Sequence, residues 1–452
     1  MNDPKNNLTA KRILAAVAAV LIAVAIFIAG YFTYYLTLGE GFRSLLWVKN
    51  KLQEEYYQEI SDDDFWQAAI EGTNSLVDRY SRYYTADEYD AELNADRGLR
   101  AGVGASFFSG SNKIARIAIG SPLFLAQPNA DLAGGWVTGV GSSENALSDT
   151  FDLDSLSREM QKFSEGDRVF LRVSSVGERD TNTETCVVLE VVSAKYIESN
   201  VLYAESGAAY AMLYNANGEG VWTEVGKYTS VDEKTPFGQA YLRLTQFSGN
   251  AAGEFTRAAM QYRESADSGK VQKLLLDLRN NGGGRLDILQ EISAYFLANT
   301  QDQHPVVLRA KYRGGKEEIA RAARNTSFVF GNCDVRVAAN FNTASASEAL
   351  IGVMIDYGAI SYSDVYLTDL SAQGGAAPAT YGKGIMQTTF RNASTGEAIK
   401  MTTAQIFWPK GKTIHGVGVT LKDGALSSPA LSAMEYGDAE LAAIFSDISK
   451  NS

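Results

Sequence analysis

The stretch Asn342-Thr343-Ala344-Ser345-Ala346-Ser347-Glu348 (NTASASE) places a serine where a predicted strand passes into a predicted helix. Residues Val335–Ala339 (VRVAA) read as a buried strand, and Ala346–Tyr357 carries apolar side chains at helical spacing. Ser345 is therefore expected at a helix N-terminus, where unpaired N–H groups and the helix dipole can stabilise an oxyanion. Ser345 and Glu348 also fit a capping box, which any helix can use. This stretch alone leaves a structural cap and a nucleophile open.

Composition narrows the function classes. The 452 residues suffice for two or three domains, and the net charge of −12 disfavours nucleic-acid binding, which selects for basic stripes. Cys186 and Cys333 lack C-x-x-C or metal-ligand spacing, and a disulfide between them stays open. His304 and His415 are the two histidines, which excludes a histidine-rich metal site and leaves few candidates for a histidine base. We expect no metal and no cofactor.

The N-terminal segment predicts a membrane anchor. No charged residue occurs from Ile13 to Gly39, which is long enough for a helix to span a bilayer. Basic residues precede this segment and aromatic residues follow it, so the positive-inside rule puts residues 1–12 in the cytoplasm and predicts a transmembrane helix at 13–36. A cleavable signal peptide is the alternative. In both cases the bulk of the chain lies outside the cytoplasm.

Two segments of different character follow the anchor. Residues 40–98 are rich in helix formers and include Asp78–Tyr89 (DRYSRYYTADEY), where Thr85 and Glu88 fit a helix cap. Residues 99–195 predict a small β domain. Its expected strands are Val103–Phe107, Ile114–Ile119, Val169–Val173 and Val187–Val192, with one amphipathic helix at Leu153–Phe163. Such a domain can add a ligand strand to a sheet edge and hold a terminal carboxylate, although a β domain without a ligand stays open.

The remainder predicts α/β alternation. Val201–Gly238 is assigned only to strands and loops. Ala240–Leu244 is expected as a strand, Gly253–Glu264 as a helix, and Val271–Leu278 as a strand buried on both faces. A glycine cluster then precedes a helix expected at 286–297 and lets the backbone approach a ligand. It lacks the spacing of a phosphate-binding loop, so an oxyanion site and a plain tight turn both stay open.

Lys383 lies between two glycines in Thr380–Gln387 (TYGKGIMQ). A serine must lose its proton to attack a carbonyl, and a lysine accepts that proton only when its ammonium form is destabilised. Burial among apolar side chains destabilises the ammonium and lowers the pKa of a lysine. Tyr381, Ile385 and Met386 supply such surroundings. His415 is the rival base, and by itself Lys383 also fits an exposed loop lysine.

Five motifs in order resemble the carboxyl-terminal processing proteases, also called tail-specific proteases. They are AYLRLTQF, LLLDLRNNGGG, NTASASEALIG, TYGKGIMQ and the late run from Thr402 to Ile414, preceded by DRYSRYYTADEY, which resembles the family's N-terminal helical segment. Each motif alone is weak, whereas the ordered set covers nearly the whole exported chain.

This resemblance implies an α/β fold (α+β overall) with an inserted PDZ domain and a protease core related to the crotonase and Clp folds. It implies Ser345 as nucleophile, Lys383 as general base and Gln387 as the group that positions the lysine. Gly283 and Ala346 would supply the oxyanion-hole N–H groups, with the neighbouring glycines as alternatives to Gly283. The loop Gly102-Val103-Gly104-Ala105 would stand for the carboxylate-binding loop of the PDZ domain.

The implied organisation has a PDZ-like domain at 99–195 and a protease core at 196–452. Compared with the family pattern, the chain has extra residues between Ser345 and Lys383, at about 361–379. The implied function is an extracytoplasmic, membrane-anchored serine endopeptidase. Its partners would be protein or peptide substrates with free, apolar C-termini. The oligomeric state, the physiological substrate and whether the PDZ domain activates or inhibits stay open.

Two other functions remain as alternatives. A catalytically inactive, membrane-anchored scaffold of the same fold would bind peptides without cutting them, but it would be free to lose Ser345, Lys383 or Gln387. An acyl-CoA enzyme of the crotonase type fits the core fold. Export and the serine–lysine pair disfavour it.

Overall fold

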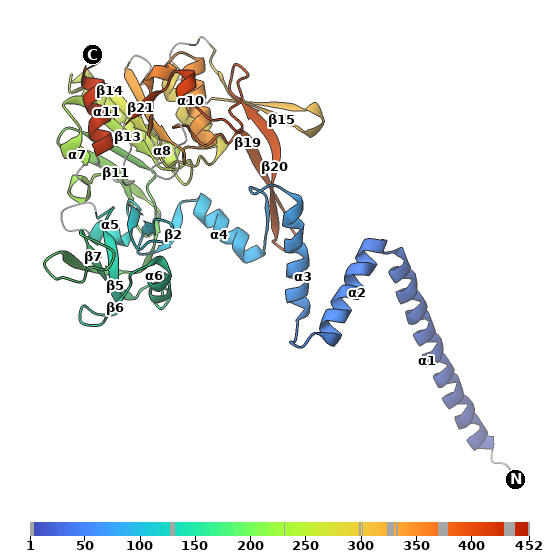
Figure 1. Cartoon of the computed structure of the whole chain (residues 1–452). Helices are drawn as coiled ribbons and strands as arrows, with labels where there is room; N and C mark the ends of the chain where they lie inside the picture. The colour runs from blue at the N-terminus through green and yellow to red at the C-terminus, as the bar shows by residue number, and fades with distance from the viewer. Residues whose placement is uncertain are drawn as a thin grey trace. The chain divides into compact units, whose positions relative to one another are not determined.

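The computed structural model describes residues 4–126, 132–229, 231–297, 300, 302–322, 330, 333–368, 378–428 and 439–450 (Figure 1). The chain divides into two compact units, Met1–Tyr83 and Tyr84–Ser452. The finer domain boundaries stay predictions.

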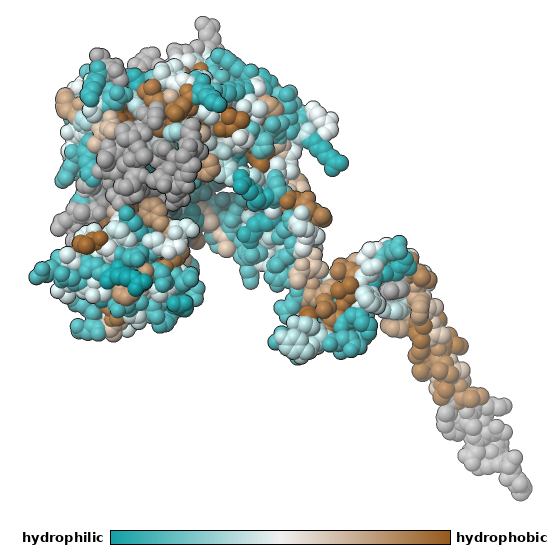
Figure 2. Space-filling view, in the orientation of Figure 1, coloured by the Kyte–Doolittle hydropathy of each residue, from teal (hydrophilic) through white to brown (hydrophobic). Residues whose placement is uncertain are grey.

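The N-terminal unit is helical. It contains α1 (Pro4–Thr37), α2 (Glu40–Glu55), α3 (Asp62–Glu71) and the 3₁₀ turn η1 (Gly72–Leu76). Within α1, Leu14–Tyr34 has a mean hydropathy of 2.6, and none of its most apolar window is buried by protein. Figure 2 shows this stretch as a band of hydrophobic residues. An apolar helix that no protein covers fits a membrane anchor or a signal sequence.

A mixed sheet forms the core of the second unit. Its strand order is β12-β11-β10-β13-β14-β17-β18-β21. The strands β13 (Gly238–Leu244), β14 (Val271–Asp277), β17 (Asp334–Asn340), β18 (Val365–Thr368) and β21 (Leu426–Ser428) run parallel. Three antiparallel strands extend it: β10 (Val201–Glu205), β11 (Ala208–Tyr214) and β12 (Gly220–Glu224). They lie in the segment Val201–Gly238, which the sequence assigned only to strands and loops; η2 (Gly226–Tyr228) and α7 (Val231–Lys234) follow them.

Helices cover both faces of the parallel strands. Leu274 and Leu276 of β14 pack in one apolar core with α8 (Ala251–Asp267), α9 (Leu286–Ser293) and α10 (Ala346–Asp356). Leu275 points to the other face, in a core shared with α11 (Ala439–Lys450). This burial on both faces is why β14 reads as an unbroken apolar run. The predicted strands and helices around Ser345 and the glycine cluster are confirmed, and the helix expected at 286–297 ends as the 3₁₀ turn η3 (Ala294–Phe296).

A second, antiparallel sheet was not predicted. It contains β15 (Val306–Tyr312), β16 (Glu317–Arg321), β19 (Ile385–Arg391) and β20 (Ala398–Phe407). The 3₁₀ turn η4 (Arg313–Gly315) joins β15 to β16, η5 (Tyr362–Asp364) precedes β18, and η6 (Leu421–Asp423) precedes β21. Residues 369–377 of the extra loop expected at 361–379 lie outside the described residues.

Helix α4 (Ala86–Asp96) leads into a small β module, residues 99–197. The predicted cap of α4 is confirmed, because the Thr85 N–H donates to Glu88 Oε2 at 2.9 Å. The module's elements are β2 (Leu99–Gly102), β3 (Ala105–Phe107), β4 (Ile114–Ile117), α5 (Pro122–Ala126), β5 (Trp136–Gly141), β6 (Leu147–Asp149), α6 (Leu153–Met160), β7 (Arg168–Ser174), β8 (Cys186–Val192) and β9 (Ala194–Ile197).

One predicted strand of the module was too long at its start. Gly104 lies inside the predicted strand and adopts a φ of 93°, which is outside the range of a regular strand, so β3 begins only at Ala105. Cys186 and Cys333 are both free thiols.

A substitution at Gly352 tests how tightly α10, the helix that follows Ser345, is packed. A Cβ atom at this position would lie 2.2 Å from the ring of the buried Trp408. We expect Gly352→Ala to lower the free energy of unfolding by about 1–3 kcal/mol, because the backbone and ring must separate. Urea unfolding measures this change. Gly177→Ala, where a Cβ meets no atom within 4 Å, is the control, and equal stability of the two variants would contradict the packing.

Candidate active site

The turn that carries Ser345 is tied to the end of the neighbouring strand. The Asn340 N–H donates to Thr343 Oγ1 at 2.9 Å, and Thr343 Oγ1 donates to the Leu278 carbonyl at 2.8 Å. Ser345 itself has φ 57° and ψ −115°, a conformation that residues with a side chain rarely adopt. The turn therefore holds the serine in a strained conformation directly before α10.

The glycine cluster is anchored by a buried ion pair at the end of β14. Asp277 accepts hydrogen bonds from the Arg279 N–H and Nε, both at 2.9 Å, and from Tyr241 Oη at 2.7 Å. Burial alone would raise the pKa of Asp277, but the Arg279 guanidinium outweighs it and lowers the pKa to about 2. These bonds thus fix the position of the backbone at the start of the loop that follows β14.

Gly283 lies against the serine turn. A Cβ on Gly283 would be 2.8 Å from Ser345 Cβ and from the Ala346 nitrogen, and its φ is 96°, so only glycine fits. Its N–H donates to Asn281 Oδ1 at 2.9 Å, while Asn281 Nδ2 donates to the Leu244 carbonyl at 2.8 Å. The predicted pair of backbone groups is brought together, although the Gly283 N–H already has an acceptor.

Glu348 joins the serine turn to the lysine loop. Its Oε2 accepts the N–H groups of Ser345 at 3.0 Å and Lys383 at 2.9 Å. Its Oε1 accepts the Gly382 N–H at 2.8 Å and the Thr380 hydroxyl at 2.5 Å. The side chain is fully buried, and burial raises the pKa of the carboxyl despite these bonds. The sequence indicated Glu348 only as a helix cap.

The five predicted catalytic and oxyanion residues line one pocket of about 450 Å³: Ser345, Lys383, Gln387, Gly283 and Ala346. Gln387 comes from β19, and its Nε2 donates to Thr402 Oγ1 at 3.1 Å. His415, which the structure describes, is not among the lining residues, so the geometry does not favour it as a base. These five residues come from the glycine cluster, the serine turn at the start of α10, the lysine loop and β19.

Sequence reasoning missed an ion pair in the same pocket. Lys400 Nζ lies 2.8 Å from Glu92 Oε1, and both side chains line the pocket. Asp96 lies there too, and burial raises the pKa of its carboxyl. Glu92 and Lys400 are 308 positions apart in the chain, so no local pattern could have paired them.

A second pocket, of about 420 Å³, lies in the small β module. The predicted loop Gly102–Ala105 lines it, together with the apolar side chains of Leu156 and Met160 from α6. The loop is fixed from behind, because the Leu123 N–H donates to the Val103 carbonyl and the Ala118 N–H to the Gly104 carbonyl, both at 2.8 Å. We call this pocket the module pocket.

Comparisons with known proteins identify the family of the core. Residues 238–362 match the model of Peptidase family S41. The chain carries a peptidase family S41 domain. It is 27% identical to a "Probable CtpA-like serine protease" of Staphylococcus saprophyticus over 86% of this chain and 66% of that relative. A relative of the same name from Staphylococcus haemolyticus is 30% identical over 44% of this chain and 36% of its own length.

Among solved structures, the photosystem II D1 C-terminal processing protease is similar to this chain with a TM-score of 0.44 and 18% identity, covering 85% of each chain. The match of residues 238–362 to the S41 model and the CtpA-like relatives agree with the family that the motifs indicated. The family match contains the motifs of the glycine cluster and the serine turn but ends before Lys383 and Gln387. The roles of individual residues therefore remain predictions.

Glu348 gives a direct test of the architecture of the S41 site. We expect Glu348→Gln to lower the free energy of unfolding by roughly 1–3 kcal/mol, because an amide cannot accept all four donors. Urea unfolding measures the loss. Glu291→Gln, at an exposed position on α9, is the matched control, and an unchanged stability of Glu348→Gln would show that the two loops are held by other contacts.

Proposed function

We propose that the chain is a serine endopeptidase in which Ser345 is the nucleophile and Lys383 the general base. The observation that carries this proposal is the pocket that Ser345, Lys383, Gln387, Gly283 and Ala346 line together. The strained φ of 57° at Ser345 and its position before α10 support the nucleophile, since helix N-termini favour developing negative charge.

The reaction follows from these positions. Neutral Lys383 Nζ takes the proton of Ser345 Oγ as the oxygen attacks the scissile carbonyl carbon. The resulting oxyanion accepts hydrogen bonds from the N–H groups of Ala346 and Gly283, the latter being shared with Asn281. The Lys383 ammonium then protonates the leaving amine, and water, deprotonated by the same lysine, releases the acyl group from Ser345. Gln387 orients the lysine from β19.

We propose further that the small β module is a PDZ domain that captures substrate C-termini in the module pocket. The apolar lining from α6 suits an apolar last residue, while loop N–H groups suit a terminal carboxylate. Its charged lining residues are Arg100, Arg116 and Glu198, so two guanidiniums surround one carboxylate. This positive excess favours an anionic chain end.

The apolar helix α1 supports a single-pass anchor in the cytoplasmic membrane, with the catalytic unit on the outer side. The sequence of the mature N-terminus decides between this anchor and a cleaved signal: a start near Thr37 would mean that the apolar segment is removed.

Catalysis is tested with Ser345→Ala and Lys383→Ala on a protein with an unstructured, apolar C-terminus. We expect each variant to lower kcat/KM by at least roughly 1,000-fold, because each removes a group that acts in the transition state. Cleavage is followed by gel and mass spectrometry between about pH 6 and pH 9. The control is Lys422→Ala at an exposed position. Full activity of Lys383→Ala would refute the dyad, and no cleavage by the wild type would favour a scaffold.

Tail capture is tested by the binding of a labelled peptide with a free apolar C-terminus. We expect Met160→Asp to weaken binding at least about 10-fold, because it places a charge in the apolar lining. Fluorescence anisotropy measures the affinity, and Arg158→Ala, on an exposed part of the same helix, is the control. Equal affinity for an amidated peptide would contradict carboxylate recognition.

A further inference from the structure

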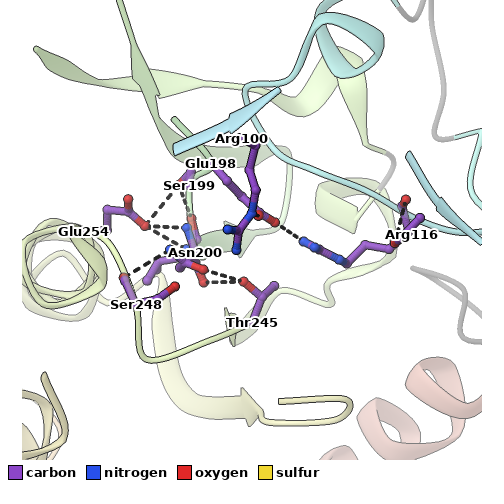
Figure 3. Close-up of polar contacts among 10 residues, drawn as sticks. Arg100, Arg116, Glu198, Ser199, Asn200, Thr245, Ser248 and Glu254 are labelled. Carbon is purple, nitrogen blue, oxygen red and sulfur yellow. Dashed lines mark hydrogen bonds and ion pairs between the residues drawn. The ribbon is translucent and has the colours of Figure 1, made fainter. Parts of the chain in front are cut away.

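Glu254 is a buried carboxyl that the proposed mechanism does not use. It lies in the first turns of α8 with no exposed surface. Its Oε2 accepts the N–H groups of Asn200 at 2.6 Å and Val201 at 3.0 Å, and the Ser199 hydroxyl at 3.2 Å. Figure 3 shows Glu254 beside Ser199 and Asn200. Its Oε1 accepts Tyr214 Oη at 2.5 Å.

The segment that Glu254 holds, Glu198–Val201, connects the module pocket to the catalytic sheet; we call it the junction. At its start, the buried Glu198 pairs with Arg100 and Arg116, which line the module pocket. At its end, Val201 opens β10 of the sheet. The junction is therefore one of two covalent connections between the pockets; the other is the short segment from Asp96, which lines the catalytic pocket, to Arg100, which lines the module pocket.

The junction is also bonded toward the glycine cluster. The Thr245 N–H donates to the Asn200 carbonyl at 2.9 Å. Figure 3 shows Thr245 next to Asn200. Two residues further along, the Phe247 N–H donates to the Gly283 carbonyl at 3.0 Å. A displacement of the junction would thus reach the loop that contains Gly283.

The charge of Glu254 makes its contact with the junction depend on pH. Among the ion pairs of the described residues, none includes Glu254, and an ionised carboxylate buried without a cation is costly. Burial is the largest influence and raises the pKa of Glu254 to about 7, although the bonds from Tyr214, Asn200, Ser199 and Val201 favour the ionised form. When Glu254 is protonated, the Ser199 hydroxyl can accept its proton and still donate to the Val201 carbonyl, 3.3 Å away.

Other titratable groups face α8 as well. On the side of the sheet that α8 covers, they are Tyr203 and Glu205 from β10 and Tyr210 and Tyr214 from β11. Tyr295 Oη of η3 lies 2.7 Å from Thr256 Oγ1 of α8, and Cys333 contacts Tyr262 of α8. Strand alternation directs Arg243 and Asp277 to the opposite face. Of these groups, Tyr214 is the one bonded to Glu254.

We propose that Glu254 is a positioning residue that clamps the junction to α8, and that the clamp is firmer when Glu254 carries a proton than when it is ionised. An opened junction exposes Glu254 to water, where a glutamate has its ordinary pKa of 4.5. The closed form therefore binds more protons between about pH 4.5 and pH 7, and opening becomes easier as the pH rises through this window. The consequence for substrate cleavage rests on the proposed protease function.

Hydrogen–deuterium exchange of the full chain tests the clamp. After correction for the intrinsic rate, we expect protection of the Asn200 and Val201 amides to fall on the order of 100-fold between about pH 5 and pH 8. Glu254→Gln should keep its protection at both pH values, because a neutral amide can accept the two N–H groups and donate to Tyr214. Glu264→Gln, exposed on the same helix, should behave as the wild type.

Tyr214→Phe provides a second, milder variant. It removes a bond that favours the ionised form, so the fall in protection should move to higher pH. Constant protection in the wild type, or a fall that Glu254→Gln retains, overturns the proposal. If the chain cleaves no substrate but the exchange results are as expected, the protease function fails and the clamp stands. If it cleaves substrate without the pH-dependent exchange, only the clamp fails.

Discussion

The acceptance of four hydrogen bonds by the buried Glu348 is the interaction on which the catalytic geometry depends. Its carboxylate binds the N–H group of Ser345 on one side and those of Gly382 and Lys383 on the other, across 34 and 35 positions of sequence. None of these groups belongs to a strand ladder. Without a common acceptor, two irregular loops would leave N–H groups buried without hydrogen bonds. This would cost more folding free energy than burying one carboxyl whose oxygens accept all of these hydrogen bonds.

The sequence predicted those parts of the fold that depend on local pattern. Strand β14 is apolar throughout because both of its faces are buried, and α10 has apolar side chains at helical spacing because it packs on the same sheet. The turn between strand and helix at Ser345 follows from these two elements. This local information sufficed to locate the candidate nucleophile, and the ordered motifs supplied the lysine.

Local sequence patterns could not predict which segments far apart in the chain pair with each other. Strand β20 pairs with β15 and β19, and this second sheet brings Gln387 and Lys400 to the pocket. Glu348 looked like an ordinary cap because its first bond, to Ser345, is local, whereas its bonds to the lysine loop are not. The strand predicted from Val103 was wrong at its start because the positive φ of Gly104 interrupts it, and composition does not reveal φ.

Glu348 and Glu254 both supply hydrogen-bond acceptors to buried backbone that lies outside regular secondary structure. Each is a carboxyl, able only to accept when ionised, that collects N–H and hydroxyl donors from backbone outside regular ladders. In each, burial raises the pKa, so the group that organises the backbone also responds to protons. The difference lies in what is held. Glu348 joins two loops of one pocket and must keep them together for any chemistry, whereas Glu254 holds a segment between two pockets and has no direct hydrogen bond to Ser345 or Lys383. At the junction, a contact that depends on protonation can change how firmly the small β module is held. At Ser345, the same dependence would only weaken the geometry of the catalytic pocket.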